Sequence, residues 1–157
     1  MKTRLFLAGL LATATLLFTG CNYELPLTAK PTRKVDVRLL GVWVSFDQDE
    51  QKMEYMTVRK FDDATYVVAM DHDLYRAFHS DFAGTAFLSV QELNHDRLYL
   101  YLTATLSPDG NQLTLRTVST KVVPEATKSR AALQKFIQTN LANPALFGEP
   151  LVFTRKK

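Results

Sequence analysis

The chain has 157 residues, with 19 basic and 16 acidic side chains and a formal net charge of +3. Two of the basic residues, Lys2 and Arg4, lie in an N-terminal segment that we expect to be removed, which leaves 17 basic residues against 16 acidic ones. A domain this close to neutrality has no net electrostatic attraction to nucleic acid, so no nucleic-acid partner is predicted.

The N-terminus has the order of a secretory signal. Lys2 and Arg4 supply positive charge, and a run of apolar and small residues follows from Leu5 to Phe18. This run is shorter than the roughly 20 apolar residues that a membrane-spanning helix needs. The pattern predicts an export signal over residues 1–20 that is removed from the mature chain.

The signal ends at Cys21, the only cysteine in the chain, which excludes an internal disulfide. The segment Leu17-Phe18-Thr19-Gly20-Cys21 resembles the lipobox of bacterial lipoproteins, where the cysteine becomes the lipidated first residue of the mature chain. The resemblance implies a multiply acylated anchor at Cys21, with the membrane as a partner through the N-terminal lipid. Asn22 follows, and lipoproteins without Asp at that position resemble those sorted to the outer membrane of Gram-negative cells, facing the periplasm.

Residues 21–36 are expected to form the lipidated cysteine and a flexible tether. The stretch is polar, contains Pro26 and Pro31, and shows no sustained periodicity. At up to roughly 3.3 Å per residue, such a tether would hold the folded body several nanometres from the bilayer. The rest of the chain, residues 37–157, has the size of a single domain.

That domain is predicted to be mainly β. Leu98, Leu100 and Leu102 alternate with Tyr99 and Tyr101, which is the period of two residues that a sheet with two distinct faces requires. The short spacing between strands favours an antiparallel meander, either a small lipocalin-like barrel or a strongly curved sheet. The predicted strands are 40–46, 55–61, 65–70, 74–80, 86–91, 98–106, 113–118 and 151–154.

One late α-helix is predicted from about Thr127 to Leu141. Leu133, Phe136, Ile137 and Leu141 fall on one face of it, which indicates that this face is buried. The helix is expected to close one end of a barrel or to pack on a sheet.

Gly41-Val42-Trp43 resembles the Gly-x-Trp opening of lipocalin-like barrels. In that family the Trp lies at the closed end of the barrel and an Arg of the last strand packs across it, which implies a structural pair between Trp43 and Arg155. A cation-π contact of this kind contributes roughly 0.5 to 2 kcal/mol. More broadly, the chain from Leu39 onward resembles an uncharacterised family of small bacterial lipoproteins, on Leu40-Gly41-Val42-Trp43-Val44, on residues 73–81 and on residues 143–150, and this brings no established chemistry.

Asp71-His72-Asp73 and His79-Ser80-Asp81 are the densest polar groups. An extended chain puts His72 and His79 about 23 Å apart, too far to share a metal ion. Asp71-His72-Asp73 is therefore interpreted as a turn.

Tyr75, His79 and Asp81 would share one strand face, which either lines a ligand cavity or faces water. Ser80 points to the opposite face, so His79, Ser80 and Asp81 cannot form a catalytic triad from their own contacts. No metal or cofactor motif is present, and neither a catalytic residue nor an enzymatic activity is predicted.

Two functional classes remain open at this point. One is a non-enzymatic binding module that holds a small apolar or amphipathic ligand between alternating strand faces. The other is a structural or assembly lipoprotein that binds another envelope protein through a sheet edge or a loop surface.

Overall fold

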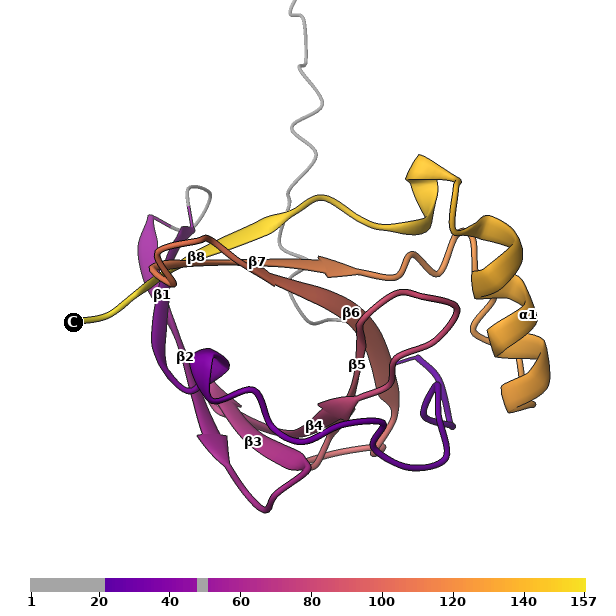
Figure 1. The fold of residues 1–157 in the computed structure, drawn as a ribbon, viewed down its shortest axis with the longest axis horizontal. Helices are drawn as coiled ribbons and strands as arrows, with labels where there is room; N and C mark the ends of the chain where they lie inside the picture. Colours follow the sequence, from indigo (N-terminus) through magenta and orange to yellow (C-terminus); the bar gives the residue numbers. More distant parts are fainter. Residues whose placement is uncertain (1–21, 48–50) are drawn as a thin grey trace, which may run out of the picture.

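The computed structural model describes residues 22–47 and 51–157, so the predicted export signal and the predicted lipidation site at Cys21 lie outside the described residues. Eight antiparallel strands follow one another around a closed barrel, and the last pairs with the first (Figure 1). This confirms the predicted antiparallel meander and selects the closed barrel over the open curved sheet. The strands are β1 (Gly41–Asp47), β2 (Lys52–Lys60), β3 (Thr65–Met70), β4 (Asp73–His79), β5 (Phe87–Glu92), β6 (Tyr99–Leu106), β7 (Gln112–Thr117) and β8 (Leu151–Arg155).

Alternation along the strands divides the apolar residues between two cores. On β6, Leu100 and Leu102 belong to the core inside the barrel, whereas Tyr99 and Tyr101 belong to a second core on the outer face. Both sets are buried, because the outer face of this part of the barrel is covered as well.

The outer cover includes helix α1 (Arg130–Asn140), which lies between β7 and β8 in the chain and packs on the outside of the barrel (Figure 1). Ser129 caps its N-terminus by accepting a hydrogen bond from the amide of Ala132. Leu133 and Ile137 are fully buried, whereas Phe136 is partly exposed. Of the two predicted positions, the helix therefore takes the one against the sheet and does not close the barrel. No helix among the described residues is long and apolar enough to cross a membrane.

The rest of the cover is the segment 22–36, which we call the strap. Tyr23 exchanges backbone hydrogen bonds with Tyr99, and the hydroxyl of Tyr101 donates to the carbonyl of Leu25 (2.5 Å). Leu27 is fully buried, and its amide donates to Ser89 Oγ. The prediction of a flexible tether over residues 22–36 was therefore wrong. Its apolar residues are spaced without a period, but they fill the outer core.

The strap runs the length of the barrel and then crosses one of its ends. The amide of Thr32 donates to the carbonyl of His79, at the end of β4, and the amide of Val35 donates to the carbonyl of Asp63. The short 3₁₀ helix η1 (Val37–Leu39) follows, with Leu39 buried in the inner core. We call this the η1 end of the barrel, and the end with the turns 71–72 and 93–98 the opposite end.

The contact expected between Trp43 and Arg155 is present at the η1 end. The guanidinium carbon of Arg155 lies 4.2 Å from the centroid of the Trp43 ring, and the Trp43 indole donates to the carbonyl of Leu39. Arg155 also donates to the carbonyls of Arg38, Leu40 and Gly110. One guanidinium thereby joins η1, β1, β8 and the turn between β6 and β7.

Gly41 makes room for this group. Its φ of +137° is a conformation that side chains rarely adopt, and a Cβ there would lie 2.8 Å from Arg155 Nη1. The glycine of the Gly-x-Trp motif is therefore required both by its backbone conformation and by the arginine beside it.

We expect Arg155→Ala to lower the free energy of unfolding by about 2 to 4 kcal/mol, because three carbonyls lose a charged donor and Trp43 loses its stacking partner. Chemical denaturation followed by the fluorescence of Trp43, the only tryptophan in the chain, measures this directly. Arg116→Ala is the matched control, since that guanidinium lies 5.3 Å from the Phe147 ring and makes one long hydrogen bond at the surface. Equal effects of the two substitutions would contradict a special role for Arg155.

Candidate ligand-binding cavity

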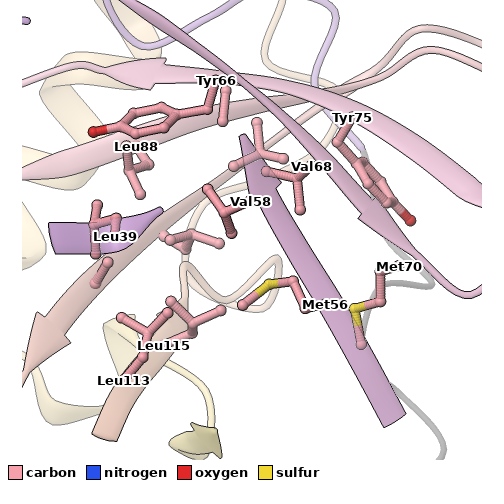
Figure 2. A pocket seen from close by; sticks show the side chains of 14 residues that line it. Leu39, Met56, Val58, Tyr66, Val68, Met70, Tyr75, Leu88, Leu113 and Leu115 are labelled. Carbon is pink, nitrogen blue, oxygen red and sulfur yellow. The ribbon is translucent and has the colours of Figure 1, made fainter. Parts of the chain in front are cut away.

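An apolar cavity of about 50 Å³ lies inside the barrel (Figure 2). Every strand from β2 to β7 contributes to its wall through side chains at alternate positions, and η1 contributes Leu39. The lining residues are Leu39, Met56, Val58, Tyr66, Val68, Met70, Tyr75, Ala77, Leu88, Val90, Leu102, Ala104, Leu113 and Leu115.

The two ends of the cavity differ in chemistry. Leu39 and Tyr66 lie toward the η1 end, where the strap and η1 pass across the barrel. Met56, Met70 and Tyr75 lie toward the opposite end, and Met56 pairs with Met70 across β2 and β3. Methionine is unbranched and adapts its shape at low cost, so this end of the wall can rearrange around a guest more easily than the branched residues elsewhere.

His79 lies at the η1 end and is buried, with Nε2 2.7 Å from the hydroxyl of Tyr66. That hydroxyl accepts a hydrogen bond from the amide of Asp36 (2.6 Å). The hydrogen bond between this hydroxyl and Nε2 can run in either direction, according to which nitrogen of the neutral ring carries the proton. Nδ1 is buried and has no hydrogen-bond partner among the described residues.

This environment favours the neutral imidazole. Burial lowers the pKa of His79, and the positive charge of Arg33 lowers it further, against the weaker opposing effects of Asp81 and Asp36. Protonation would make Nε2 a donor, so the hydroxyl of Tyr66 would then have to accept from both His79 and the amide of Asp36. His79 therefore ties the strap to the barrel while it is uncharged.

The structure does not bring Tyr75, His79 and Asp81 into one ligand site, so that prediction was wrong as a group. Tyr75 lines the cavity, but His79 is bonded to Tyr66 at the η1 end. Asp81 lies beyond the end of β4 and pairs with Arg33 at the surface (3.2 Å). The alternation expected for Asp81 fails because the strand stops at His79.

Ser80 belongs to the outer core and not to a site with His79. Its Oγ lies 2.8 Å from Ser89 Oγ and accepts from Thr28 Oγ1, which belongs to the strap. These contacts lie between the strap and the barrel. Asp71 and His72 form the tight turn between β3 and β4, as predicted, with φ of +50° at Asp71, whereas Asp73, expected in the same turn, begins β4.

Ligand atoms of Asp73, Glu92 and His95 lie within 4.8 Å of one another at the opposite end of the barrel. This separation is compatible with a divalent cation, and the sequence did not reveal it because the residues come from β4, β5 and the following turn. His95 is largely exposed, and Asn94 Nδ2 already lies 3.3 Å from Asp73 Oδ1.

Most of the cavity wall was not predicted as a site. Four of the lining residues occupy strand positions that look like ordinary core: Met56, Met70, Leu113 and Leu115. Only the alternation that points every second side chain of neighbouring strands into the barrel could have indicated them. Tyr66 was missed as the partner of His79, because the two are neighbours across β3 and β4 and not along the chain. No family model, curated protein or solved structure matches this chain.

We expect the free energy of unfolding to fall as the pH drops below about 6.5, the usual value for histidine in an unfolded chain. The folded-state pKa of His79 is lower, so the unfolded chain binds more protons in this window, with a slope of up to about 1.4 kcal/mol per pH unit. Denaturation of His79→Gln, which keeps an acceptor for Tyr66 but does not titrate, measures the loss of this slope between pH 7.5 and 5.5. The exposed His72→Gln should retain the slope, and an unchanged slope in His79→Gln would show that another group is responsible.

Proposed function

We propose that this protein is a lipid-anchored binding module of the cell envelope that holds a slender apolar chain, such as the end of an acyl chain, inside its barrel. The observation that supports this most directly is a cavity whose wall comes from alternate residues of β2 to β7 and is apolar throughout, apart from the tyrosine hydroxyls. An apolar ligand entering such a space gains the transfer free energy of the surface it buries.

The size of the cavity restricts the ligand. A single water needs roughly 10 to 15 Å³ measured in the same way, so about 50 Å³ corresponds to about four waters or a few methylene groups. Drug-sized ligands occupy about 300 to 1,000 Å³, which excludes a bulky ring system in the cavity as it stands. A longer chain needs Met56 and Met70 to rearrange, and both are suited to this.

The proposed anchor is the acylated Cys21, and the proposed location is the outer membrane, facing the periplasm in a Gram-negative cell. The signal-like segment and the lipobox-like residues before Cys21 support it. The anchor would keep the barrel beside a supply of acyl chains. This proposal includes no cofactor and no catalytic step.

We expect Cys21→Ser to abolish incorporation of a labelled fatty acid into the protein, because the acyl chains need the thiol, and to shift the protein out of the membrane fraction. Fatty-acid labelling in the producing cells, followed by fractionation, measures both. Thr19→Ser, two residues away, should leave the label in place. Label retained in Cys21→Ser would rule out the proposed anchor.

We expect the domain to bind a slender polyene fatty acid whose fluorescence rises in apolar surroundings, and Ala104→Leu to weaken this binding by about tenfold or more. The added side chain fills part of the cavity, and each methylene kept out of it costs about 0.8 kcal/mol. Fluorescence titration measures the dissociation constant, and thermal unfolding of each variant confirms that it is folded.

The control for this substitution is Ala131→Leu, which adds the same group at an exposed position of α1. Equal affinity in the two variants would place the fatty acid outside the cavity. No binding by the unaltered domain, together with crosslinking to an envelope protein, would favour the assembly role instead.

A further inference from the structure

The outer face of β8, β1 and β2 carries an exposed apolar patch, formed by Phe46, Met53, Tyr55 and Val152. Each of these side chains is about half exposed. They are neighbours, because Phe46 pairs with Met53 and the carbonyl of Val152 accepts from Ser45 Oγ. A shallow hollow on this face is lined by Phe46, Met53 and Tyr55. The strap and α1 cover a different part of the barrel, over β4 to β6, so neither reaches this patch.

The patch extends to the end of the barrel opposite η1. Phe46 and Met53 form the last pair but one before the turn that joins β1 and β2. Leu74, the second residue of β4 after the 71–72 turn, is also about half exposed at this end. Two further exposed apolar residues, Val37 and Phe61, lie at the η1 end and serve as an internal comparison.

The chain leaves the described structure at this same end. The amides of Asn22 and Tyr23 both donate to the carbonyl of Tyr99, the first residue of β6. Since the strap is packed on the barrel, only Cys21 separates Asn22 from the proposed acyl chains. One residue spans at most about 3.6 Å, so a lipid on Cys21 brings the bilayer surface close to the start of β6.

We propose that the protein docks on the bilayer with the end opposite η1, and that Phe46, Met53 and Leu74 enter the membrane interface. This inference rests on the proposed anchor at Cys21. Apolar and aromatic side chains are the residues that interfacial elements bury at the boundary between headgroups and acyl chains. The same end carries Met56, Met70 and Tyr75 of the cavity wall, so the end of the barrel that can adapt to a guest faces the lipid.

Charge selects the kind of bilayer. Among the described residues, the acidic side chains at the docking end are Asp71, Asp73, Glu92 and Asp96, and the basic ones are Lys52 and Arg97. At the η1 end, Arg38 is paired with Asp36 and Lys60 with Asp63, and the ammonium of Lys156 lies 4.8 Å from the centroid of the Tyr55 ring. An anionic surface would repel the excess of acidic side chains at the docking end, so the partner is a bilayer with zwitterionic headgroups.

The test uses the single cysteine of the chain. Protein beginning at Cys21 is coupled through that thiol to a maleimide lipid in phosphatidylcholine vesicles, so that the attachment does not depend on cellular lipidation. Met53→Trp and the control Phe61→Trp place a tryptophan at the docking end and at the η1 end. Trp43 is fully buried at the η1 end and adds the same background to both.

We expect lipids brominated on their acyl chains to quench about half or more of the fluorescence added by Met53→Trp and little of that added by Phe61→Trp. Interfacial side chains lie roughly 5 to 10 Å into the boundary, within reach of the bromines. Replacing phosphatidylcholine with an anionic lipid should reduce the difference between the two variants. Equal quenching of both, or stronger quenching of Phe61→Trp, would overturn the proposed orientation.

A second outcome would assign the patch to another copy of the chain. If Cys21→Ser protein dimerises in solution and Met53→Asp abolishes the dimer, the patch is a protein interface and the bilayer proposal is wrong. The anchor and the cavity are judged separately, by fatty-acid labelling of Cys21→Ser and by the binding of fatty acid to Ala104→Leu.

Discussion

The barrel depends on one partly buried junction, where the guanidinium of Arg155 meets the ring of Trp43 and three backbone carbonyls. In the part of the chain that the structure describes, β1 and β8 pair at Trp43–Arg155 and Val44–Thr154, so the sheet closes over a short ladder. The side chain of Arg155 supplements that ladder by linking η1 and the turn between β6 and β7 to the same point. A buried carbonyl left without a donor lowers the free energy of unfolding by about 1 to 3 kcal/mol. A single side chain that serves three carbonyls therefore contributes substantially to the stability of the closed barrel.

The two faces of the sheet are used differently. Outside, the strap and α1 seal β4 to β6 with Tyr23, Leu27, Leu133 and Ile137, all of which are almost completely buried. The covered side of the molecule therefore has a second layer of packed side chains outside the sheet. Inside, the wall leaves a narrow apolar space, and the outer face of β8, β1 and β2 remains exposed. The parts available to a ligand or a membrane lie where neither cover reaches.

The strands could be predicted because their alternation is a local property of the sequence. The pattern Leu100-Tyr101-Leu102 required a sheet with two faces, and both faces proved to be buried. The strap could not be predicted, because Tyr23 and Leu27 belong to a short segment interrupted by Pro26, and their partners on β6 and β5 lie more than 60 residues away. Only the closed fold shows which side chains they bury against.

The candidate site was less predictable than the fold for a related reason. Tyr75 lies on a strand face for which the sequence left a cavity and water as alternatives, and the structure places it in the cavity wall. Asp81 was assigned to the same face by continuing the alternation past the point where β4 ends. The cavity itself is a property of strand closure, since its wall combines residues from six strands and η1, and no single segment of the sequence carries that information.

The short ladder between β1 and β8 also determines at what stage of synthesis or export the barrel can close. Arg155 bonds to the carbonyl of Leu40 across 115 residues of sequence, so the closing contact is among the most distant pairings in the chain. Contacts of this kind form slowly, because the loop between them must be ordered before they contribute. A chain that emerges from its N-terminus, from a ribosome or through a translocation channel, has seven strands with two free edges until residue 155 arrives. The barrel can therefore close only after the last strand has emerged. Until then the polypeptide can still pass through a channel as an open chain.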